Sequence, residues 1–100
     1  MKKIKAGSHK ITNEVIFNLI KPYLKKGHRI LDFGAGSGYM CQKIGNYLLE
    51  NGLNPEEIIF ACDISPENFQ YSLITCSQTS PDSVIPFPDE TFNVIYAIKL

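Results

Sequence analysis

The sequence of 100 residues lacks any long hydrophobic run, which excludes a membrane-spanning helix. Its longest unbroken apolar stretches are five residues each, at 58–62 and 94–98, whereas a transmembrane helix needs about 20 residues. The basic residues near Met1 are not followed by an apolar stretch, so they do not form a signal peptide.

Cysteine is also scarce. The three cysteines stand at positions 41, 62 and 76, no two of them form a C-x-x-C pair, and the two histidines lie far from them in sequence. This pattern disfavours a disulfide framework and a structural metal site, so we expect no bound metal. Free, buried thiols are typical of a reducing compartment, and we therefore expect a cytoplasmic protein.

Net charge is absent, because ten basic residues balance ten acidic ones, but the distribution is uneven. Residues 1–29 hold eight of the basic residues and a single acidic residue, Glu14. A basic leader can attract an anionic substrate, nucleic acid or an acidic lipid surface. No aromatic residues are interleaved among the first lysines, so nucleic-acid binding is not indicated and we favour a solvated segment. The length allows one domain, which we place at 12–100 after a basic leader at 1–11.

Hydrophobic periodicity and turn residues predict alternating helices and strands. Thr12-Asn13 can cap a helix, which Pro22 should kink or break near Ile20-Lys21. Ser65-Pro66 is typical of a helix start. The predicted helices span 12–24, 39–51 and 66–71, the predicted strands span 29–33, 58–62, 73–78 and 92–98, and turns are predicted at 54–55 and 86–90. Such alternation is typical of an α/β protein with a parallel sheet and helices on both faces.

A glycine-rich segment between the first strand and the second helix is the most informative feature. Gly34, Gly36 and Gly38 let the backbone turn tightly and approach a ligand without an intervening Cβ. Asp63, which ends the next strand, can accept hydrogen bonds from both hydroxyls of a ribose. A tight turn without a ligand is the alternative, but the combination of loop, flanking elements and acid favours nucleotide binding.

The glycine spacing also separates classes of nucleotide site. It is G-x-G-x-G, which differs from the G-x-G-x-x-G of dinucleotide-binding dehydrogenases. No G-K-[ST] follows, which excludes a triphosphate-binding P-loop, and the absence of G-x-S-x-G excludes the nucleophile-elbow hydrolases.

Three segments resemble motifs of the class I S-adenosylmethionine-dependent methyltransferases, in the order in which that family has them. They are ILDFGAGSG at 30–38, ACDISPE at 61–67 and IPFPDETFNVI at 85–95. The resemblance extends from about residue 12 to residue 98. It implies a Rossmann-like parallel sheet with flanking helices, truncated after the fourth strand, and methyl transfer from S-adenosylmethionine to an unidentified small-molecule acceptor.

The resemblance also implies a cofactor site, carried over residue by residue. Gly34, Ala35 and Gly36 would line the methionine part of S-adenosylmethionine, and Asp32 would lie near its amino group. The site residues that it implies are Asp32, Gly34, Ala35, Gly36, Gly38, Asp63, Ile64, Ser80 and Asp82.

The adenosine end of that implied site involves the later residues. Asp63 would bind the ribose hydroxyls and Ile64 would pack against the adenine, whereas Ser80 and Asp82 are alternatives for its edge. The sequence departs from the family pattern at Asn93, where an aspartate is usual. The stretch from Asp63 to the last strand is also short, so the helix at 66–71 is abbreviated, which would open one wall of the adenine pocket.

Methyl transfer from a sulfonium chiefly requires that donor and acceptor be held in line, and no residue of this chain stands out as catalytic. Two other functions stay open: a non-catalytic cofactor-binding module that acts through a partner, and, less favoured, an NAD(P)-dependent oxidoreductase. The last predicted strand, 94–98, would be an exposed sheet edge. We therefore expect that the chain is the N-terminal part of a longer protein, or that a second copy or a partner chain covers this edge.

Overall fold

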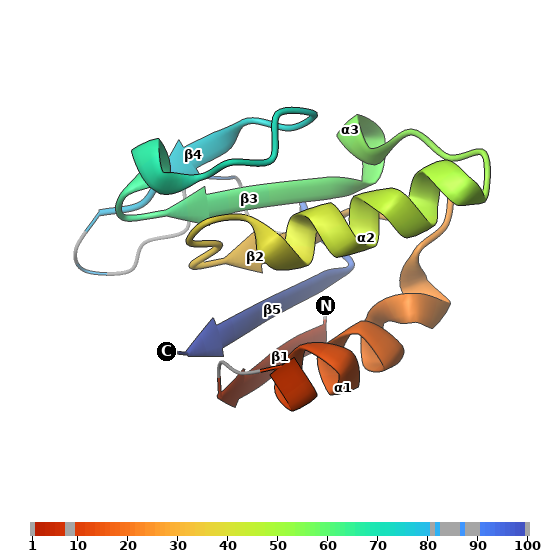
Figure 1. Ribbon diagram of the computed structural model, residues 1–100, viewed down its shortest axis with the longest axis horizontal. Helices are drawn as coiled ribbons and strands as arrows, with labels where there is room; N and C mark the ends of the chain where they lie inside the picture. The colour runs from red at the N-terminus through yellow and green to blue at the C-terminus, as the bar shows by residue number, and fades with distance from the viewer. Residues whose placement is uncertain (1, 8–9, 81, 83–86, 88–90, 100) are drawn as a thin grey trace.

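The computed structural model, which describes residues 2–7, 10–80, 82, 87 and 91–99, shows a single parallel sheet. The sheet has five strands in the order β1-β5-β2-β3-β4, and each neighbouring pair is parallel (Figure 1). The predicted α/β class with a parallel sheet and flanking helices is therefore confirmed. The strands are β1 (Lys2–Gly7), β2 (Ile30–Phe33), β3 (Ile59–Asp63), β4 (Cys76–Gln78) and β5 (Val94–Lys99).

The four strands expected from the sequence follow the Rossmann order. Along the sheet they run β4-β3-β2-β5, so the chain moves outward from β2 to β4 and then returns to the other side of β2. The strand order reverses between β2 and β5, and α/β sheets bind ligands outside the carboxyl ends of the strands at such a switch point. The end of β2, where the glycine-rich loop begins, lies at this position.

The prediction of a basic leader at 1–11 is wrong for Lys2–Gly7, which form strand β1. It pairs with β5 along its whole length, from Lys2 opposite Val94 to Gly7 opposite Lys99. The prediction that 94–98 forms an exposed edge is therefore wrong, since β5 has β1 on one side and β2 on the other. This pairing gives the backbone N–H and C=O groups of β5 partners on both sides.

The helices agree with the sequence in part. The first is α1 (Lys10–Ile20), followed by the 3₁₀ turn η1 (Lys21–Tyr23), so the predicted break at Ile20-Lys21 is confirmed. The predicted start of this helix is wrong, because α1 begins two residues before the predicted Thr12-Asn13 cap. The other helical segments are α2 (Tyr39–Glu50), α3 (Pro55–Ile58) and the 3₁₀ turn η2 (Pro66–Asn68).

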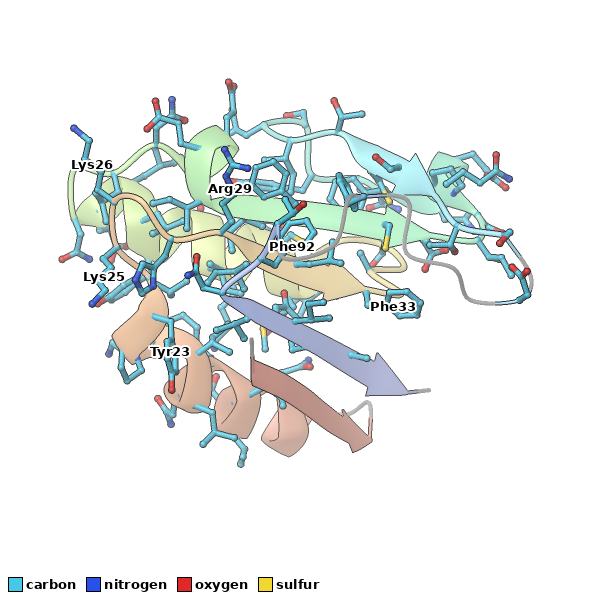
Figure 2. All side chains as sticks on the ribbon, turned by 180° about the vertical axis from the view of Figure 1, so that it is seen from behind. Tyr23, Lys25, Lys26, Arg29, Phe33 and Phe92 are labelled. Carbon is cyan, nitrogen blue, oxygen red and sulfur yellow. The ribbon has the colours of Figure 1, made fainter. Side chains whose placement is uncertain are left out.

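Both long helices, α1 and α2, cover the same face of the sheet (Figure 1), which we call the helix face. The prediction of helices on both faces is wrong for the described residues. On the opposite face, Phe92 and Phe87 pack edge-on against Phe60 of β3, and Figure 2 shows Phe92 and Phe33 on this side. The steps from β1 to β2 and from β2 to β3 cross the sheet in one direction. Right-handed crossovers therefore put both helices on one face.

Alternating side chains of the strands divide the core into two clusters. Ile30, Ile59 and Val94 are fully buried on the helix face, whereas Leu31 and Cys62 are buried on the opposite face. This is the period-two pattern of strands covered on both sides.

The predicted apolar stripe on the first helix is only partly buried. Ile16 and Ile20 contact the core, but Val15 and Leu19 are exposed. Val15 and Leu19 each precede a buried residue by one position, which places them about 100° around the helix axis from Ile16 and Ile20.

The predicted helix at 66–71 is also wrong, because η2 ends at Asn68 and Ser65 makes no side-chain capping bond. The backbone N–H of Gln70 donates to the carbonyl of Ser37, at 2.8 Å, instead of to its own helix. Tyr71 is buried among the residues of the helix face. Most of the turn predicted at 86–90 lies outside the described residues.

Candidate functional site

The glycine-rich loop, residues 34–38, lies over the carboxyl end of β3. The N–H groups of Gly34 and Ala35 both donate to the carbonyl of Cys62, at 2.9 and 3.0 Å. The N–H of Gly38 donates to the carbonyl of Ala35 and closes the turn. These bonds direct the chain from β2 across the neighbouring strand before α2 begins at Tyr39.

Asp63 joins this loop to the end of β3. Its Oδ1 accepts the N–H of Gly36 at 3.0 Å, and its Oδ2 accepts the N–H of Ser65 at 2.9 Å. A carboxylate oxygen has two lone pairs, so each oxygen retains room for another donor. The structure thus brings together two of the features that the sequence singled out, 27 positions apart.

The loop glycines differ in what surrounds them. All three have positive φ, at 80°, 57° and 89° for Gly34, Gly36 and Gly38. A Cβ built on Gly34 or Gly36 would meet nothing within 4 Å, whereas one on Gly38 would lie 2.8 Å from Phe69. The space beside the first half of the loop is therefore open, and Phe69 covers the second half.

The remaining residues of the predicted adenosine end follow the strands β3 and β4. Ile64 is 52% exposed beside Asp63, an unusual exposure for a large apolar side chain after a buried strand. The N–H of Thr79 donates to the carbonyl of Asp63 at 2.9 Å, which fixes the residue before Ser80. Ser80 donates to Asp82, and both side chains are exposed.

Asp32 is buried more deeply than Asp63 and Ile64 of the predicted site. It is 2% exposed on the helix face of β2, and its Oδ2 accepts hydrogen bonds from Tyr96 Oη at 2.9 Å and from Cys41 Sγ at 3.2 Å. Burial raises the pKa of Asp32 from 3.8 to about 6, because desolvation outweighs the two hydrogen bonds, which lower it. The carboxyl group is therefore mostly ionised at neutral pH.

Three residues of this region were missed from the sequence: Tyr96, Cys41 and Phe69. Tyr96 stands 64 positions from Asp32, and the sequence predicts only a buried strand at its position. Strand alternation places it beside Asp32, since these two residues are register partners on β5 and β2. No sequence signal predicts that Phe69 lies against the glycine-rich loop, because the sequence predicts a helix at 66–71, whereas η2 ends at Asn68.

A cavity of about 490 Å³ lies away from these residues. It is lined by residues of 56–60 and 72–77 together with Phe87, none of which belongs to the predicted cofactor site. This cavity lies beside the amino ends of β3 and β4, whereas the loop and Asp63 lie at the carboxyl ends.

The described residues contain no group of three or more His, Cys, Asp or Glu side chains that could hold a metal ion. Their three cysteines are free, and burial raises the pKa of Cys62 to about 12 and that of Cys76 to about 11. Both thiols are therefore protonated at neutral pH. No helix in the described ranges is long and apolar enough to cross a bilayer.

Comparisons with known proteins identify no relative. No family model matches the chain, and searches of curated proteins and of solved structures return no match.

Proposed function

We propose that this chain binds S-adenosylmethionine at the carboxyl ends of β2 and β3 and serves a methyltransferase that acts on a small molecule. The observation that carries the proposal is the hydrogen bond between Gly36 N and Asp63 Oδ1, at 3.0 Å. It joins a glycine-rich loop and an acidic strand end beside the switch point of a Rossmann-ordered sheet.

The residues present fit an adenosine with an attached amino acid. The two oxygens of Asp63 can each accept one further hydroxyl, which suits the vicinal diol of a ribose. The exposed side chain of Ile64 offers an apolar surface for a base beside that diol. The open space at Gly34 and Gly36 lets a ligand approach the backbone closely.

When bound, S-adenosylmethionine would supply an electrophilic methyl group on a sulfonium. The contribution of the chain is to hold the donor in place, and restricted orientation of this kind can lower a barrier by about 7–11 kcal/mol. Asp63 would fix the ribose, and Asp32 would provide negative charge at the amino-acid end. The free thiols are compatible with a reducing compartment, and on this basis we propose a cytoplasmic location.

Isothermal titration calorimetry with S-adenosylhomocysteine tests the proposal, with NADH as the competing nucleotide. We expect micromolar binding of the former and none of the latter. Binding of NADH alone would favour an oxidoreductase, and binding of neither would contradict the proposed function.

The Asp63→Asn variant tests the assignment of the ribose contact. An amide has one acceptor oxygen instead of two, and loss of a charged hydrogen bond costs about 1.5–3 kcal/mol, so affinity should fall at least tenfold. Glu50→Gln, at the end of α2, is the matched control and should leave affinity unchanged. Equal affinities for Asp63→Asn and the wild type would overturn the assignment, provided that circular dichroism shows both to be folded.

A further inference from the structure

A cavity of about 490 Å³ lies beside the amino ends of β3 and β4, on the face of the sheet opposite the long helices, which Figure 2 shows. Ser77, which lines the cavity, is the register partner of Cys62, and Cys62 is buried on that face. Phe60, another lining residue, packs edge-on against Phe92 of the same face. Cavities that bind small molecules usually have volumes of about 300–1,000 Å³, so this one is large enough for a ligand.

The cavity is separate from the proposed cofactor site. Phe60 precedes Asp63 by three residues on β3, which corresponds to about 10 Å along a strand. The glycine-rich loop lies beyond that point, over the carboxyl end of β3. A methyl acceptor must come within about 3–3.5 Å of its donor. A molecule held in this cavity is therefore neither the cofactor nor the acceptor.

The apolar walls of the cavity suit an aromatic group. Phe60 and Phe87 meet edge-on, with ring centroids 6.3 Å apart and an interplanar angle of 76°. Both rings line the cavity and are only partly buried, so a third ring can pack against them. Leu73, which is 41% exposed, and Ile74 extend the apolar wall. A ligand ring would remove these side chains from water.

The polar groups of the cavity favour a cation. Glu56 is the single ionisable side chain among the described residues that line it, and it is exposed. Asn54 Oδ1 accepts the N–H of Glu56 at 3.0 Å, which fixes the backbone of the glutamate beside the cavity. The other polar residues that line it carry hydroxyl groups: Ser72, Thr75 and Ser77. A carboxylate beside aromatic rings attracts a positively charged group, which the ring faces also attract.

We propose that this cavity is a second ligand site, which binds a small aromatic amine. The ring of the ligand packs against Phe60 and Phe87, and its protonated amine pairs with Glu56. The inference goes beyond the proposed function and does not depend on it, because no described lining residue belongs to the cofactor site.

Nitrogen-15 NMR titration with phenethylamine tests the class of ligand, with phenethyl alcohol as a probe of nearly the same shape without the charge. We expect millimolar affinity for the amine, because the probe is small, and at least tenfold weaker binding of the alcohol. The backbone signals of Phe60, Leu73 and Ser77 should shift, and those of Gly36 and Asp63 should not. Equal affinities would refute the role of the charge, and shifts confined to the glycine-rich loop would refute the location.

The Glu56→Gln variant tests the ion pair, because it removes the charge and keeps the size of the side chain. It should weaken phenethylamine at least tenfold and leave the affinity for phenethyl alcohol unchanged. Glu57→Gln is the matched control, since Glu57 is the next residue of α3, is exposed and does not line the cavity. An unchanged affinity in Glu56→Gln, or an equal loss in both variants, would overturn the pairing with Glu56.

The Phe87→Leu variant tests the aromatic wall, because it keeps an apolar side chain and removes the ring. It should weaken both probes about threefold, and unchanged affinities would contradict the stacking. If circular dichroism shows that this variant does not fold, Leu73→Ala at the exposed part of the wall gives the same test.

The Asp63→Asn variant tests whether the two sites are separate. Folded Asp63→Asn should bind phenethylamine with the affinity of the wild type, even where its affinity for S-adenosylhomocysteine is lost. A parallel loss of both ligands would show one shared site and would contradict the proposal.

Discussion

The contact between Tyr71 and Gly45 offers a quantitative test of the packing on the helix face. Tyr71 is buried, and its hydroxyl group has no hydrogen-bond partner among the described residues. A Cβ at Gly45, in the middle of α2, would lie 2.0 Å from Tyr71 Oη and 2.6 Å from Tyr71 Cζ. The absence of a side chain at Gly45 therefore makes room for the tyrosine ring.

Replacement of Gly45 by alanine has two opposing effects on stability. In a helix interior the change gains about 1 kcal/mol of helix propensity. Overpacking in a core costs about 1–3 kcal/mol, and a separation of 2.0 Å is deep within the contact distance. We expect Gly45→Ala to lower the free energy of unfolding by up to about 2 kcal/mol.

Replacement of Tyr71 by phenylalanine should act in the opposite sense. A buried hydroxyl without a partner costs about 1–3 kcal/mol, so Tyr71→Phe should raise the free energy of unfolding by about 1 kcal/mol. In the double variant the nearest remaining ring atom, Cζ, is 2.6 Å from the new Cβ, so the clash is relieved only in part. We expect a favourable coupling of about 1 kcal/mol between the two substitutions.

Urea denaturation followed by circular dichroism measures all four proteins of this cycle. Asn46→Ala, at the next and exposed position of α2, is the control for helix propensity and should raise stability by less than about 1 kcal/mol. Stabilisation by Gly45→Ala, to the extent expected of an open helix surface, would refute the reasoning.

Three further predictions concern buried charge, register and the core. Because the pKa of Asp32 is raised to about 6, the folded state binds more protons than the unfolded state between about pH 4 and pH 6. The free energy of unfolding should therefore fall by about 3 kcal/mol as the pH rises from about 4 to about 6. Urea titrations of Asp32→Asn should lack this pH dependence. Asn93 accepts the N–H of Arg29 at 2.8 Å, so Asn93→Ala should cost about 1 kcal/mol in thermal unfolding while Asn93→Asp, which keeps an acceptor, should cost little. Leu48→Ala, at a fully buried position, should cost about 3 kcal/mol, and an equal loss for the 52% exposed Leu49→Ala would contradict the packing.

Local signals were sufficient for the central part of the fold. Strand β2, helix α2 and strand β3 agree with their predicted ranges to within one or two residues, because glycines and short apolar runs delimit them. The same signals placed the glycine-rich loop and Asp63 at neighbouring strand ends, where the structure joins them by a hydrogen bond.

What the sequence failed to predict depends on contacts between distant segments. Strand β1 is rich in lysine, and its alternation of polar and apolar residues is confined to Lys3–Ala6, too short to predict a strand without its pairing with β5. The helix start at Ser65-Pro66 was a sound local signal, but Gln70 and Tyr71 form contacts with the loop and with α2 that are incompatible with a longer helix. The hydrogen-bond donors to Asp32 could not be predicted either, because no periodicity links Tyr96 to a residue 64 positions away.

The insertion of β5 between β1 and β2 has a consequence for how the chain folds. Both partners of β5 precede it by most of the sequence, so the centre of the sheet forms only when its last strand arrives. Pairings of this range slow folding, typically into the millisecond-to-second regime, because loop closure must precede any gain from contact. Until then β1 and β2 present unpaired edges that can recruit other chains. Self-association of this protein is therefore most to be expected during refolding, before β5 has paired with β1 and β2.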